Sequence, residues 1–163
     1  MIERVTKVTL TTELPIGAEV ACALARTPEL FLHLVAPILT APHLRFPQPV
    51  VPGVEASARL WWFGALPTWR HHLRLVRLEP HSIYTNEWGG PVRTWNHLLT
   101  FEPIGESRCR YTDEIELGDG PRGIPVALFA RLMFRHRHRR WRKLATLLAN
   151  SGLDLRPSPT DRP

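Results

Sequence analysis

The sequence predicts a single α+β domain in which a curved antiparallel sheet of six to seven strands wraps around one long C-terminal helix. Five segments between residues 53 and 117 are typical of consecutive strands, and the segment from Pro125 to Asn150 has neither Pro nor Gly after its first residue. The 163 residues, 44% of them hydrophobic, suit one domain with its own core. We expect this domain to span residues 1–150, followed by a proline-containing flexible tail over 151–163.

Before the main sheet, the chain predicts one strand and two short helices. Apolar and polar side chains alternate from Val8 to Leu14, which indicates a strand with one solvent-facing side. Residues 18–26 are rich in alanine and helical, and Thr27 is placed to cap a second helix that starts at Pro28. Five prolines between residues 37 and 52 then predict a loop with room for an edge strand.

The central part of the chain predicts a meander of antiparallel strands separated by Gly and Pro residues. The expected strands are Val54–Phe63, Trp69–Glu79, Ser82–Trp88, Val92–Glu102 and Ser107–Leu117. The glycine-rich segment 118–123 ends the pairing. Because the apolar face of such a sheet must be covered, we expect the long C-terminal helix to pack against it, with the two short helices closing one end.

Four polar side chains fall on the faces of these strands that should point inward. They are His71, His97, Tyr111 and Asp113, and their neighbours on the same faces are mostly apolar. An unpaired buried polar group costs about 1 to 3 kcal/mol, so these residues require partners. They can satisfy one another within the core, orient a ligand in a cavity, or, in the case of His97 and Asp113, act as a catalytic acid–base pair.

The C-terminal helix carries a basic run from Arg135 to Lys143. On a helical wheel Arg137 falls within the apolar stripe that contains Met133, with Trp141 at its edge. Three interpretations are open: a solvated helix end, an internal Arg137 that binds a carboxylate of Asp113, Glu87 or an acidic ligand, or an association with nucleic acid or another anionic surface.

Composition and missing motifs narrow the classes of function. The net charge of +6 is compatible with anionic partners without naming one. Cys22 and Cys109 are too few for a disulfide framework and too far apart for a zinc site, so we expect two reduced, buried thiols and no bound metal.

The N-terminus has no signal-peptide pattern and no apolar run approaches the ~20 residues that span a bilayer, so we expect a cytoplasmic protein.

The sequence also lacks the motifs of the common enzyme classes. It contains no Gly-x-Ser-x-Gly, Gly-Lys-Ser/Thr, His-Glu-x-x-His or Gly-x-Gly-x-x-Gly pattern, so hydrolase, nucleotide, zinc-protease and dinucleotide functions have no support. We therefore expect no cofactor.

Three segments resemble the helix-grip superfamily that includes START domains, birch-pollen-allergen-like proteins and polyketide cyclase/dehydrase proteins, often called SRPBCC. They are residues 90–97 (Gly-Pro-Val-Arg-Thr-Trp-Asn-His) followed by Phe101, residues 111–116 around Asp113, and residues 134–138 (Phe-Arg-His-Arg-His). They are similar to patterns of one uncharacterised bacterial branch. The resemblance implies an internal cavity for a hydrophobic molecule such as a lipid or polyketide, but it implies no reaction.

We therefore expect a protein that binds or transports a hydrophobic small molecule, as a monomer or homodimer. A cyclase- or dehydratase-like enzyme that uses His97 and Asp113 is the first alternative, and nucleic-acid or anionic-surface association through the basic helix is the second. The residues expected to bind the ligand are Trp69, His71, Leu73, Trp95, His97, Phe101, Tyr111, Asp113, Met133, Arg137 and Trp141.

Overall fold

A computed structural model describes residues 5–118 and 123–153 and confirms the predicted α+β architecture. The tail from residue 154 onward, and residues 119–122 of the glycine-rich loop, lie outside the described residues. Seven strands form one antiparallel sheet in the order β1-β7-β6-β5-β4-β3-β2. The strands are β1 (Thr6–Leu14), β2 (Leu39–Thr40), β3 (Glu55–Trp62), β4 (Leu66–Glu79), β5 (Ser82–Gly89), β6 (Val92–Pro103) and β7 (Cys109–Leu117).

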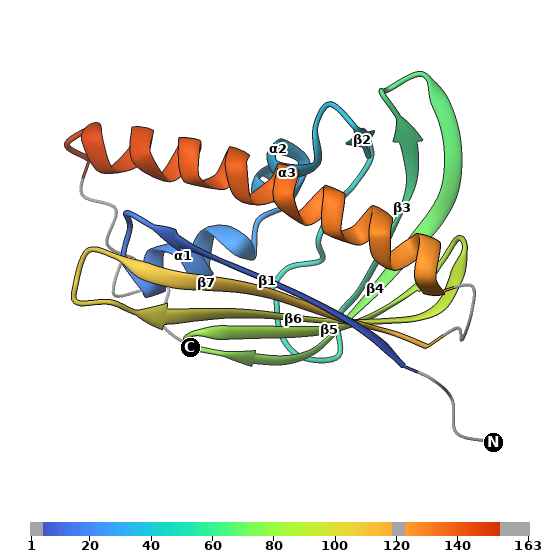
Figure 1. Cartoon of the computed structure of the whole chain (residues 1–163), viewed down its shortest axis with the longest axis horizontal. Helices are drawn as coiled ribbons and strands as arrows, with labels where there is room; N and C mark the ends of the chain where they lie inside the picture. Colours follow the sequence, from blue (N-terminus) through green and yellow to red (C-terminus); the bar gives the residue numbers. More distant parts are fainter. Residues whose placement is uncertain (1–4, 119–122, 154–163) are drawn as a thin grey trace.

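Three helices complete the fold. Helix α3 (Gly123–Asn150) lies across one face of the sheet, and α1 (Ala18–Ala25) and α2 (Pro28–Val35) lie on the same face, as Figure 1 shows. The predicted cap is present, since the backbone N–H of Leu30 donates to Thr27 Oγ1 over 3.3 Å. Helix α3 starts two residues earlier than expected, at Gly123, because a proline is tolerated in the first turn of a helix.

The predicted inward faces of the strands are confirmed. On β7, alternate residues from Cys109 to Leu117 are fully buried, while the residues between them are more exposed. On β6, His97 and Phe101 are buried and Thr94 is exposed. The proline-rich segment supplies the edge strand β2, which pairs with Trp61 and Trp62 of β3. A side-chain period of two was therefore enough to set the orientation of both strands.

The largest cluster of buried residues lies where α1 and the C-terminal half of α3 meet β6 and β7. Its largest fully buried side chains are Trp141, Tyr111 and Phe101, whose rings pack against one another at centroid distances of 4.9 to 6.0 Å. Cys22 and Cys109 are buried free thiols in the same cluster, as expected, and burial raises the pKa of Cys109 to about 11.

Among the described residues, no helix is both long and apolar enough to cross a membrane.

The turn between β5 and β6 depends on a glycine that touches the neighbouring strand. Gly89 has φ +107°, and a Cβ atom placed on it would lie 2.2 Å from the carbonyl oxygen of Arg70 in β4. Gly53 has a similar φ of +95°, but a Cβ atom there would meet nothing within 4 Å. Both glycines relieve backbone strain, and only Gly89 also permits a close approach between strands.

We expect Gly89→Ala to destabilise the protein by roughly 1 to 3 kcal/mol more than Gly53→Ala, because only the first substitution adds a steric clash to the shared backbone strain. Urea denaturation of the two variants measures the difference. Equal midpoints and slopes would contradict the assigned contact between Gly89 and Arg70.

Candidate functional site

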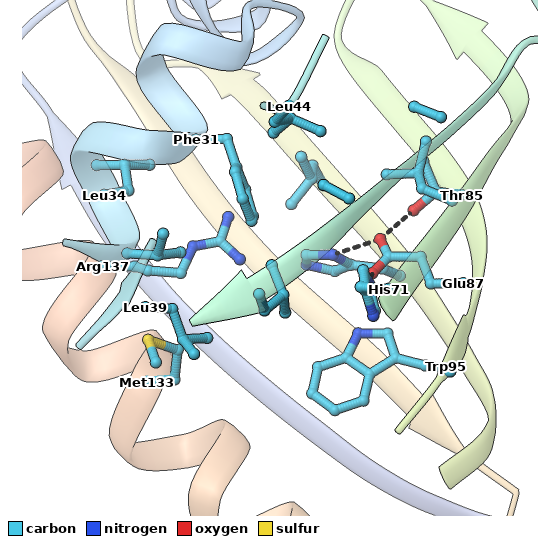
Figure 2. Close-up of a pocket in the computed structure, with 18 of the residues that line it drawn as sticks. Phe31, Leu34, Leu39, Leu44, His71, Thr85, Glu87, Trp95, Met133 and Arg137 are labelled. Atoms are coloured by element: carbon cyan, nitrogen blue, oxygen red, sulfur yellow. Dashed lines mark hydrogen bonds and ion pairs between the residues drawn. The ribbon is translucent and has the colours of Figure 1, made fainter. Parts of the chain in front are cut away.

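A cavity of about 620 Å³ lies between the sheet and the helices α2 and α3. Strands β3 to β6 form one wall, and α2, α3 and the loop after β2 form the other. Most of its lining is apolar, and Figure 2 shows Phe31, Leu34, Leu39, Leu44 and Met133 around it. A volume of this size falls in the range of pockets that enclose small organic molecules.

The structure places eight of the eleven expected ligand-binding residues on the cavity wall. They are Trp69, His71, Leu73, Trp95, His97, Met133, Arg137 and Trp141. The other three, Phe101, Tyr111 and Asp113, point to the same side of the sheet but do not line the cavity. Phe101 and Tyr111 are covered by Trp141, and Asp113 lies behind His97 and His138.

His97 stands between two carboxylates. Its Nε2 lies 2.7 Å from Asp113 Oδ1 and its Nδ1 lies 3.4 Å from Glu87 Oε1. An ionised carboxylate only accepts hydrogen bonds, so both ring nitrogens donate and the ring is an imidazolium. Burial would lower the pKa of His97, but the hydrogen bonds to Asp113 and Glu87 outweigh it and raise this pKa to about 9.

Asp113 joins the sheet to helix α3. Its side chain is fully buried; Oδ1 accepts from His97 and Oδ2 accepts from His138 Nε2 over 3.0 Å, while Arg137 Nη2 lies 3.8 Å from Oδ1. Burial would raise the pKa of Asp113, yet the charge of Arg137 and the hydrogen bonds from His138 and His97 hold it well below its usual range. Asp113 is therefore an anion that both layers of the fold neutralise.

Glu87 is the second buried anion, and it faces the cavity. Its Oε1 accepts from Thr85 Oγ1 over 2.7 Å (Figure 2), and its Oε2 lies 2.8 Å from His71 Nε2. Burial would raise the pKa of Glu87, but the hydrogen bonds from His71 and His97 hold it below its usual range. The Nδ1 of His71 is buried with no partner among the described residues, and its ring meets Trp95 edge-to-face at 6.5 Å.

Together these side chains form a continuous network from β4 to α3, which we call the charge cluster; all of its members are buried except His71, which is half-buried. Its members are His71, Thr85, Glu87, His97, Asp113, Arg137 and His138. The two anions, Glu87 and Asp113, are balanced by the cations His97 and Arg137. His71 and His138 each lie within hydrogen-bond distance of one carboxylate oxygen, on Glu87 and on Asp113 respectively. The cluster thus contains one cation for each of its buried anions.

The expected pairing of Arg137 with Asp113 is present, but it is loose. At 3.8 Å, the contact between Nη2 and Oδ1 is an ion pair that is too long for a hydrogen bond. Glu87, the other expected partner, is engaged by Thr85 and His71 instead. The guanidinium also lies 5.5 Å from the ring of Phe134.

The basic run of α3 is divided between the core and the surface. Arg137 and His138 are buried in the charge cluster, His136 Nε2 donates to the carbonyl of Ala36, and Arg140 Nε donates to the carbonyl of His33. These contacts tie α3 to α2 and to the segment that follows α2. The exposed cations that remain in the run are Arg135, Arg139, Arg142 and Lys143.

Three members of the charge cluster were missed as site residues or given only a minor role by the sequence analysis. Thr85 and Glu87 alternate with Ile83 on the inward face of β5, so the period of two could have identified them. His138 gave no such signal, because its inward position depends on how α3 is rotated against the sheet. Within the described residues, no group of three or more His, Cys, Asp or Glu side chains is arranged to hold a metal ion.

Solved structures share this fold at low sequence identity. Protein CV1439 from Chromobacterium violaceum matches with a TM-score of 0.69 at 13% identity, over 85% of this chain and 96% of that one. A START superfamily protein from Mycobacterium smegmatis matches with a TM-score of 0.67 at 14% identity, over 87% and 98%. Truncated norcoclaurine synthase from Thalictrum flavum matches with a TM-score of 0.65 at 11% identity, over 92% and 96%.

These likenesses confirm the predicted START-like helix-grip fold, and at such identities they show the fold alone. No curated protein matches the sequence. One family model matches residues 32–145, which include the cavity wall from β2 to α3 and every member of the charge cluster. The chain therefore belongs to the family described as domain of unknown function DUF8410.

Proposed function

We propose that this protein binds or carries a hydrophobic small molecule in the cavity between the sheet and α3. The observation that carries the proposal is a 620 Å³ cavity lined mostly by apolar side chains, with polar groups gathered on one part of its wall. Enclosing an apolar molecule removes its surface from water, and a few fixed polar groups set its orientation. The START-like fold supports the same function by analogy.

The geometry favours a binding protein over the acid–base enzyme. A catalytic His97 would need a ring nitrogen within reach of a substrate, but both of its nitrogens are directed at carboxylates. Asp113 is fully buried and does not line the cavity. One similar structure is norcoclaurine synthase in complex with dopamine and hydroxybenzaldehyde, at 10% identity, so an enzyme on this fold remains the alternative that experiments must distinguish.

We expect the purified protein to bind the neutral fluorescent probe N-phenyl-1-naphthylamine, and Ala58→Phe to weaken this binding about tenfold or more. Ala58 is buried on the cavity wall, so a larger side chain there occupies ligand space. A fluorescence titration gives both affinities, and native mass spectrometry of freshly purified protein identifies any molecule already bound.

Ala65→Phe is the matched control, because Ala65 is exposed in the turn between β3 and β4 and does not line the cavity. It should leave probe affinity unchanged. If the wild type does not bind the probe, or if both variants bind it equally well, the cavity is not the binding site.

We also expect the stability of the protein to depend on the charge of His97. The pKa of His97 is about 9 in the folded protein and 6.5 without its partners, so the folded state binds this proton more tightly. The resulting stabilisation is complete below about pH 6.5 and is lost as the pH rises towards 9. Urea denaturation should show a fall in the free energy of unfolding on the order of 3 kcal/mol across this interval.

His97→Gln should flatten this part of the profile, whereas His43→Gln, in an exposed loop, should not. An equally stable wild-type protein at pH 6.5 and pH 9 would show that His97 is neutral in the folded state. It would then be available as an acid or a base, and the argument against the enzyme would fail.

A further inference from the structure

Resting on the proposed function, we infer that the ligand is an apolar monocarboxylic acid whose carboxylate binds the guanidinium of Arg137 inside the cavity. Arg137 is 8% exposed, lines the cavity, and extends its guanidinium from α3 into the space between Phe31 and the strands (Figure 2). A buried cation in an apolar cavity requires an anionic partner.

The protein provides that partner only in part. The Nε of Arg137 is buried with no hydrogen-bond partner among the described residues, and its nearest carboxylate oxygen, on Asp113, lies 3.8 Å from Nη2. Asp113 cannot serve Arg137 better, because its two oxygens already accept from His97 and His138 at 2.7 and 3.0 Å. The guanidinium thus keeps N–H donors for a ligand.

Glu87 does not compete for these donors. Both of its oxygens are engaged, one by Thr85 and His97 and the other by His71. Its charge is matched by the His97 cation within the same network. Two arginines line the described cavity wall: Arg26, whose Nη2 contacts Cys22 Sγ at 3.8 Å, and Arg137, which lies 3.8 Å from Asp113 and near the Tyr111 hydroxyl. Arg137 is the one that belongs to the charge cluster and lies beside the polar part of the wall.

The charge and shape of the site select the class of anion. The planar guanidinium fork fits a carboxylate in a bidentate arrangement. Because Arg137 offers a single guanidinium, one carboxylate matches its charge, whereas a phosphate dianion would lack a second cation. The rest of the wall requires an apolar body, because it is mostly apolar and includes the edge-to-face group of Trp62, Trp69 and Phe129.

The test compares three probes that share one alkyl chain: dodecanoate, methyl dodecanoate and 1-dodecanol. Displacement of N-phenyl-1-naphthylamine at pH 7.5 gives their affinities. We expect the wild type to bind dodecanoate about tenfold to a hundredfold more tightly than either neutral probe, which is the range of a charge-assisted hydrogen bond. Equal affinity for all three probes would overturn the inference, while any saturable displacement would still support the hydrophobic cavity.

Arg137→Met should remove the preference for dodecanoate and leave binding of 1-dodecanol unchanged or improved. Arg139→Met is the matched control, because Arg139 is exposed on the same helix, and it should keep the wild-type preference. Should Arg137→Met fail to fold, Arg137→Lys keeps the charge but not the fork, and its preference should fall by at least threefold. A folded Arg137 variant with the full wild-type preference would assign the anion to another residue.

Discussion

The buried negative charge of Asp113 is the constraint on which the rest of the structure depends. An anion without solvent access must be matched by groups held at fixed positions, and those groups come from both layers, with His97 on β6 and Arg137 and His138 on α3. Their contacts specify how α3 is rotated and how far along the sheet it lies. Apolar packing alone tolerates such shifts more readily, because it has no preferred direction.

The cavity is a consequence of where the two layers are in close contact. Near β1 and β7, α3 packs directly on the sheet, and Val8, Ile115 and Phe134 fill the interface. Between α3 and strands β3 to β6, side chains from α2 and the proline-rich segment enclose a cavity without filling it. The charge cluster extends from the packed interface near β7 to the cavity. The side chains that position α3 on the sheet therefore also supply the polar part of the cavity wall.

The sequence was sufficient for the fold and for the orientation of each long strand, because these follow from local patterns. Every alternate residue of β7 is buried as expected, and Thr27 caps α2. The sequence could not separate Tyr111 from true lining residues, because Trp141, distant in the chain, decides that Tyr111 is covered. His136 and His138 are two residues apart, and only the rotation of α3 directs one to the Ala36 carbonyl and the other to Asp113.

The charge cluster suits ligand binding better than proton transfer, because most of its polar atoms already form hydrogen bonds with one another. A general acid or base must change its charge during turnover, but neutralising His97 would leave two buried carboxylates with one fewer donor. Arg137 is different, because its charge is permanent and its strongest available partner is only an ion pair at 3.8 Å. The network therefore keeps His97 hydrogen-bonded to its two carboxylates. Arg137 is the member of the charge cluster that is placed to bind the anionic group of a ligand.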